Sequence, residues 1–291
     1  MATLTCGERF VRCLTGQEVD RIPFGTGLGW NLWGQTLDIW RNATGNPDLR
    51  PELKFGYDKS FALPQLESGA FPHFEKRIIE EDEEYITFLD YRGITMKNRK
   101  DGLSMPDFIA YPVETEDDWE RYKNERLKID DNNRIHENWG DFRAKIKITG
   151  EAVQVGVYLW GVFGTARDIL GFEGLMFAMM DKPEMVKDIM KHFTSLWLSL
   201  WDKVADEVRI DHIHIWEDMS GKQGPLISPA MVEEFMMPCY DRIADFARAH
   251  NVRLISVDTD GNCSELLPVF MQHGVNVVFP FEVQAGSDVL Q

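Results

Sequence analysis

Two aspartates, Asp258 and Asp260, end a run of β-branched residues and stand two positions apart. Residues two apart on a strand point to the same side, with their backbones roughly 6–7 Å apart. Carboxylates in that arrangement can hold a metal ion, position a cationic substrate or share one proton. The alternative is a helix start capped by Asp260 or Asn262. Because a cap would use only one of the two carboxylates, the spacing favours a functional site.

A second carboxylate pair, Glu217 and Asp218, follows the strand-like run 211–216. Side chains alternate along a strand, so His214 lies on the face opposite to the two isoleucines of this run. The isoleucines suit a helix layer, which predicts that His214 and Asp218 point inward and that Glu217 lies at the rim. A hydrogen-bonded core histidine is the alternative for His214. Adjacent carboxylates are costly to bury without a cation or a ligand, so the pair favours function.

The candidates for acid–base catalysis are therefore Asp258, Asp260, Glu217 and Asp218. The candidate ligands of a divalent metal such as Zn²⁺ are Asp258, Asp260 and His214, and this mixture of donors favours no single metal. Without a bound cation, mutual repulsion should leave one aspartate protonated near neutral pH, where it could act as an acid.

Aromatic residues and one arginine flank these groups. Trp30 and Trp33 lie in a glycine-rich stretch, and Trp160 follows a later strand-like run, so the three indoles could wall a substrate pocket. The glycine spacing is not that of a dinucleotide-binding loop. The simpler role of these glycines is to permit a tight turn. Arg167 is a candidate clamp for a substrate carboxylate. The alternative for Arg167 is an ion pair involving its neighbour Asp168.

Short β-branched runs alternate with helical patterns along the chain, which predicts parallel strands joined by right-handed crossovers. The expected strands are 21–26, 153–159, 211–216, 253–258 and 276–281. Ligands of parallel α/β folds bind at the carboxyl ends of the strands, where the candidate residues stand.

The stretch 68–138 breaks this alternation. Its short alternating pieces predict a small antiparallel insertion, followed by a helix that begins at Thr115. The acidic run 80–84 within it is a candidate cation site, although a solvated surface is the simpler interpretation.

Composition restricts the class of protein. With 31 Lys and Arg against 48 Asp and Glu, the net charge is −17, which disfavours nucleic acids and anionic membranes as partners. We see no run of about 18 apolar residues and no signal-peptide pattern. Four cysteines without CxxC spacing suit a reduced compartment. We therefore expect a cytoplasmic protein in which residues 1–291 form a single domain.

Five motifs resemble the uroporphyrinogen decarboxylase superfamily. They are 8–23 (ERFVRCLTGQEVDRIP), 216–219 (WEDM), 224–229 (GPLISP), 235–238 (FMMP) and 258–262 (DTDGN). The resemblance spans nearly the whole chain and implies an α/β fold of the TIM type, a (β/α)₈ barrel. It also implies one of the family's activities, which are porphyrinogen decarboxylation and zinc-dependent methyl transfer from a methylated corrinoid protein to a thiol.

The chain departs from both branches of that family. The decarboxylases carry an arginine-rich loop after the first strand, whereas residues 27–33 hold no arginine. Their aspartate after the second strand is replaced in the Gln65–Glu67 region, and their tyrosine near Ile169 is missing. The methyltransferases carry His-X-Cys-Gly-Asn where this chain has 258–262, so neither soft zinc ligand is kept. Because each lost contact to a substrate carboxylate removes about 1.5–3 kcal/mol, we predict no appreciable uroporphyrinogen decarboxylation.

The leading hypothesis is an enzyme of this superfamily that transfers a methyl group in a reaction linked to a corrinoid protein, or that performs a related small-molecule reaction. A decarboxylase of uroporphyrinogen or another carboxylated substrate is the alternative, with Arg167 as its anion clamp. The third hypothesis is a module that binds a tetrapyrrole or a corrinoid protein without turnover. The expected partners are a small-molecule substrate, a corrinoid protein and a second copy of the chain in a homodimer.

About six barrel strands can be counted in the 291 residues, whereas a closed (β/α)₈ barrel needs eight. We therefore expect an incomplete barrel without its last two β/α units and with an exposed parallel edge near residues 277–281. We also expect that the chain alone is inactive.

Overall fold

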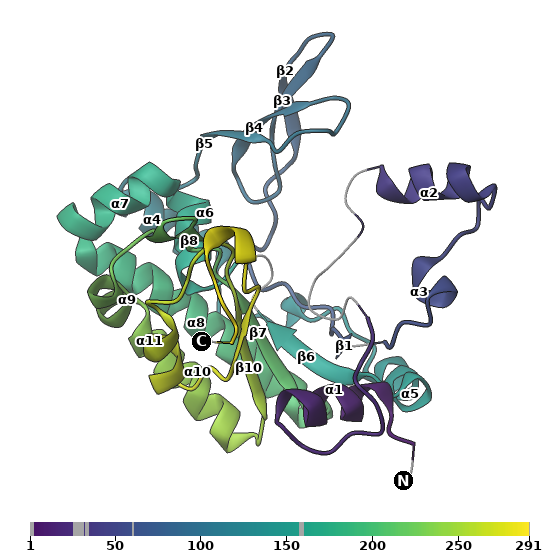
Figure 1. The fold of residues 1–291 in the computed structure, drawn as a ribbon. Coiled ribbons are helices and arrows are strands. Elements are labelled where there is room, and N and C mark those ends of the chain that lie inside the picture. Colours follow the sequence, from purple (N-terminus) through teal and green to yellow (C-terminus); the bar gives the residue numbers. More distant parts are fainter. Residues whose placement is uncertain (1–2, 26–31, 33–34, 60, 157–159, 291) are drawn as a thin grey trace.

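The computed structural model describes residues 3–25, 32, 35–59, 61–156 and 160–290. Its centre is a five-stranded sheet in the order β1-β6-β7-β10-β11, in which every neighbouring pair is parallel. The strands are β1 Phe61–Ala62, β6 Ala152–Gly156, β7 His212–Trp216, β10 Leu254–Asp258 and β11 Val277–Phe279. The parallel α/β class is thus confirmed, and four of the strands overlap predicted runs. In the described part of the chain β1 and β11 are the edges, so the sheet is open there (Figure 1).

The prediction of a strand at 21–26 is wrong for the part of it that the structure describes. Residues 21–25 form no strand and are mostly exposed. Asp58 holds this segment instead, because its carboxylate accepts hydrogen bonds from the Arg21 guanidinium at 2.7 Å and from the Phe24 amide at 2.9 Å. The edge of the sheet is formed by β1, which has two residues and is too short to be recognised in the sequence.

Helices surround the sheet. They are α1 Cys6–Leu14, α2 Thr36–Thr44, α3 Pro51–Lys54, α4 Glu116–Arg126, α5 Trp139–Thr149, α6 Val162–Leu170, α7 Phe172–Asp181, α8 Pro183–Glu207, α9 Pro229–Phe235, α10 Met237–Ala249 and α11 Leu267–Gln272, with 3₁₀ turns at Asn132–Arg134 and Val283–Ala285. A two-residue hairpin pairs β8 Ser220–Gly221 with β9 Gly224–Pro225. Among the described residues, no helix has the length and apolar character needed to cross a membrane.

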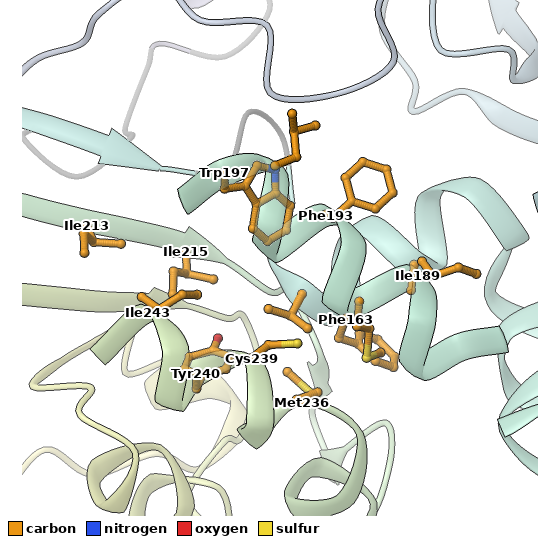
Figure 2. Close-up of a cluster of buried hydrophobic side chains, with 14 of the residues drawn as sticks. Phe163, Ile189, Phe193, Trp197, Ile213, Ile215, Met236, Cys239, Tyr240 and Ile243 are labelled. Carbon is orange, nitrogen blue, oxygen red and sulfur yellow. The ribbon is translucent and has the colours of Figure 1, made fainter. Parts of the chain in front are cut away.

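The main core lies between one face of the sheet and helices α8 and α10. Ile213 and Ile215 of β7 are fully buried on this face, beside Trp197 of α8 and Ile243 of α10 (Figure 2). Burial of each such side chain stabilises the fold by about 1.5–3 kcal/mol. The alternation predicted for residues 211–216 is therefore correct, and His214 lies on the opposite face of the sheet.

The insertion predicted within 68–138 is present and projects away from the central sheet (Figure 1). It is an antiparallel sheet of β2 Arg77–Glu81, β3 Tyr85–Leu89, β4 Thr95–Arg99 and β5 Asp107–Ala110, followed by α4. Thr115 caps α4 as predicted, and its hydroxyl accepts a hydrogen bond from the Asp118 amide at 3.1 Å. The acidic run 80–84 is exposed to solvent.

Candidate functional site

The carboxyl ends of β7 and β10 are joined through the backbone. The carbonyl oxygen of Asp258 accepts hydrogen bonds from the amides of Glu217 at 2.8 Å and Asp218 at 3.2 Å. Asp218 has a φ of +45°, a left-handed conformation that is uncommon for a residue with a side chain. The strand ends therefore set the positions of both predicted carboxylate pairs.

Three aspartates and a glutamate gather at these strand ends. Burial, together with the nearby charges of Asp260 and Asp218, raises the pKa of Asp258 to about 7. Burial and the charges of Asp218 and Glu282 also raise the pKa of Asp260. No described cation bonds to the side chain of Asp258 or Asp260, whereas Glu282 accepts the amide of Gly261 at 2.7 Å. A carboxylate with a pKa in this range can take up or release a proton near neutral pH.

Glu217 is not at the rim, and this part of the sequence prediction is wrong. Its side chain is fully buried on the helix side of β7 and accepts four hydrogen bonds. Three come from the first amides of α6, at 2.8–3.2 Å, and the fourth comes from the Tyr240 hydroxyl at 2.6 Å. Burial raises the pKa of Glu217, and these four donors oppose that rise. Glu217 therefore fixes the start of α6.

A glycine allows this close contact. A Cβ on Gly161, the residue that precedes α6, would collide with the carboxylate of Glu217. The helix start can approach the carboxylate only because no side chain lies between them. A carboxylate is also favoured at this position by the partial positive charge of a helix N-terminus.

Arg167 does not pair with its neighbour Asp168. Its guanidinium donates to the backbone oxygen of Asp218 at 2.7 Å and to its carboxylate at 3.3 Å. It also lies over the Trp160 ring, 5.4 Å from the centroid. Asp218 thus uses two of the five N–H donors of Arg167, and a substrate carboxylate would have to share the guanidinium with it.

Trp160 lies between Trp216, the last residue of β7, and a cavity that is partly lined by the insertion. One side of the indole touches Trp216, with ring centroids 4.5 Å apart. The indole nitrogen donates to Asp168 at 3.1 Å, and both residues line the cavity together with Glu67 and His73. The cavity thus lies beside the carboxyl ends of β1 and β6.

The cavity wall contains a buried ion-pair cluster that the sequence reasoning missed. Arg92, from the turn between β3 and β4, donates to Asp90 at 2.6 Å and to Asp168 at 2.7 Å. Burial raises the pKa of Asp168 to about 6, although Arg92 lowers it. No local pattern could reveal this cluster, because Arg92 and Asp168 are 76 residues apart in the chain.

His214 lies on the inner face of the sheet, as predicted, within a buried chain of hydrogen bonds. Its Nδ1 is 2.9 Å from the hydroxyl of Ser256, which in turn is 2.7 Å from Nε2 of His212. Burial lowers the pKa of His214 to about 4. The imidazole is therefore neutral at physiological pH and has no positive charge with which to attract an anion.

Two further predictions concern a metal site and an aromatic wall around the substrate. No group of three or more His, Cys, Asp or Glu among the described residues is arranged to hold a metal ion. Because the soft ligands of the methyltransferase motif are replaced by Asp258 and Asp260, these residues do not fit a zinc–thiolate centre. Trp30 and Trp33 lie outside the described residues.

Comparisons with known proteins find similarity among solved structures. No family model and no curated protein matches the chain. Among solved structures, a methyltransferase from Methanosarcina mazei has a similar fold, with a TM-score of 0.55 and 15% sequence identity. The similarity covers 94% of this chain and 75% of that protein. It supports the α/β fold over nearly all of the chain.

Proposed function

We propose that this protein is a methyltransferase in which Asp258 is the general base. The observation that carries the proposal is a carboxylate with a pKa of about 7 at the carboxyl ends of parallel strands, without a described cation beside it. A base is most effective when its pKa lies near the working pH. The similarity in fold to a methyltransferase supports the choice of reaction.

The proposed acceptor is a thiol, and the donor is a methylated corrinoid carried by a partner protein. A free thiol has a pKa of about 8.5, so Asp258 can remove its proton at a modest cost. The proton passes to a carboxylate oxygen of Asp258, and the sulfur electron pair forms the new S–CH₃ bond. The electron pair of the broken C–Co bond stays with the cobalt of the donor.

Decarboxylation is the alternative, and Arg167 disfavours it. A substrate carboxylate would compete with Asp218 for this guanidinium, which already makes two hydrogen bonds to Asp218. The two reactions also need opposite forms of Asp258. Methyl transfer requires the ionised base, whereas decarboxylation requires the acid that protonates the carbanion.

The test is turnover of methylcobalamin with 2-mercaptoethanol, followed by the loss of alkylcobalamin absorbance and by detection of the thioether. The rate should rise with pH through about 7 and then level off. Asp258→Asn should lower it by about 10²–10⁴-fold, whereas Asp245→Asn, an exposed change on α10, should leave it unchanged.

Three outcomes would contradict the proposal. A rate that falls as pH rises through about 7, or full turnover by the Asp258→Asn variant, would remove Asp258 as the base. Binding of methylcobalamin without turnover at any pH would favour the non-catalytic binding module.

A further inference from the structure

Four polar side chains on the inner face of the sheet form one continuous chain of hydrogen bonds. Gln154 of β6 lies 3.0 Å from Nδ1 of His212, and His212 and His214 both contact Ser256. Neighbouring strands hold these residues in register, because Gln154 is opposite His212 and Ser256 is opposite His214. His212 and Ser256 are fully buried, so water does not compete for their bonds.

The donor and acceptor in each of these hydrogen bonds depend on the orientation of the Gln154 amide at the end of the chain. With the carbonyl oxygen of Gln154 facing His212, as the structure places it, Nδ1 of His212 is the donor and carries the proton, whereas the flipped amide would reverse the chain. A neutral imidazole has one N–H, so Nε2 of His212 accepts from the Ser256 hydroxyl. The same hydroxyl oxygen then accepts from Nδ1 of His214. This leaves Nε2 of His214 without a proton.

The chain cannot carry a proton away from His214. A proton delivered to Nε2 would move through Ser256 to His212, and the Gln154 amide at the far end cannot accept it. Burial lowers the pKa of His212 well below the usual value. Nε2 is also the ring nitrogen farther from the β7 backbone, and no described residue bonds to it.

We infer that Gln154, His212 and Ser256 are positioning residues that lock His214 into a single tautomer, with an unprotonated Nε2 that accepts a hydrogen bond from a ligand. The site therefore selects a neutral or cationic group with an O–H, N–H or S–H donor, and it rejects a carboxylate. This inference rests on the proposed function only where it names the hydrogen-bond donor group of the substrate. The tautomer of His214 does not depend on turnover.

The tautomer can be measured directly by long-range ¹H–¹⁵N correlation on histidine-labelled protein near neutral pH. Both His212 and His214 should show a protonated Nδ1 and an unprotonated Nε2. A protonated Nε2 on His214 would overturn the inference, because it would mean that the chain runs in the opposite direction. This result would stand whether or not methyl transfer is observed.

Variants test the role of the chain. Ser256→Ala should allow both tautomers of His214 and leave the tautomer of His212 unchanged. Gln154→Glu should preserve both tautomers, since a carboxylate is also an acceptor. The matched control is Ser220→Ala, whose buried hydroxyl has no partner in the described structure. If Ser256→Ala leaves His214 in one tautomer, the chain does not lock it.

Small probes test the ligand class. Titration with 2-mercaptoethanol should shift the Nε2 resonance of His214, whereas acetate, which is only an acceptor near neutral pH, should not. A shift with acetate, or no shift with 2-mercaptoethanol, would contradict the proposed selection. Loss of the 2-mercaptoethanol shift in Ser256→Ala, with retention in Ser220→Ala, would tie binding to the locked tautomer.

Discussion

Two partly buried aspartates, Asp168 and Asp258, have opposite surroundings. Asp168 accepts hydrogen bonds from the Arg92 guanidinium and from the Trp160 indole. Asp258 has no described cation or hydrogen-bond donor at its carboxylate, and burial together with two further aspartates raises its pKa to about 7. Both carboxylates lose hydration, and only the first receives compensating partners from the protein.

This difference distinguishes a carboxylate that has a cation beside it from one that has none among the described residues. A buried charge without a partner is destabilising, and such residues cluster at functional sites. Asp168 joins the insertion to α6 through Arg92, which offsets part of the cost of burying the Asp168 charge. Asp258 has no comparable structural role, which is why we assign the chemistry to it.

The largest loss of stability should follow from removing Arg92, the cation that Asp90 and Asp168 share. Arg92→Met leaves the carboxylates of Asp90 and Asp168 buried without a cation, and breaking such a pair typically costs about 3–5 kcal/mol. We expect a loss of that size in urea unfolding at about pH 8. The loss should shrink at about pH 5, because Asp168, whose pKa is already about 6 and rises further without Arg92, is then protonated.

The matched control for this change is Arg99→Met at the end of β4. Arg99 pairs with the exposed Asp101, and an exposed ion pair contributes little to stability because water and salt screen it. Equal losses for the two variants would show that the Arg92 cluster has no special role in docking the insertion.

An intermediate effect should follow from Glu217→Gln. The amide that replaces one carboxylate oxygen is a donor and faces groups that also donate, so unfolding should become easier by about 2–3 kcal/mol. Tyr240→Phe removes only one of the four hydrogen bonds and should cost about 1–1.5 kcal/mol. If the Gln variant is as stable as the natural chain but inactive, Glu217 acts on the substrate and our correction is mistaken.

The smallest change in stability should be a gain. The folded pKa of Asp258 lies above its unfolded value of 3.8, so its charge destabilises the fold progressively as pH rises from about 4 to about 7. Asp258→Asn should therefore be more stable by about 1–2 kcal/mol at about pH 8, a value reduced because the side chain is partly open to water. The gain should vanish near pH 4, as urea unfolding at both pH values would reveal.

Strand positions and alternation could be predicted from the sequence, and long-range partners could not. The β-branched runs locate β6, β7, β10 and β11. Alternation already places Glu217 on the same face as Ile213 and Ile215, but the donors that bury it come from α6 and α10. Those donors are more than twenty residues away in the chain, so no local sequence pattern predicts them.

The remaining errors have similar causes. The run 21–26 has a strand-like composition, but Pro23 has no amide to donate to a ladder, and Asp58 provides a different anchor. Glu282 was missed because it lies beyond the last predicted strand. The chain of hydrogen bonds at His214 depends on Gln154 and Ser256, which only the register of three strands brings together.

The central claim is that Asp258 titrates near neutral pH, and a carboxyl ¹³C titration of aspartate-labelled protein tests it most directly. The resonance that disappears in Asp258→Asn identifies the residue. We predict a midpoint at about pH 7 for that resonance, and a midpoint near the ordinary aspartate value of about 3.9 would contradict the claim.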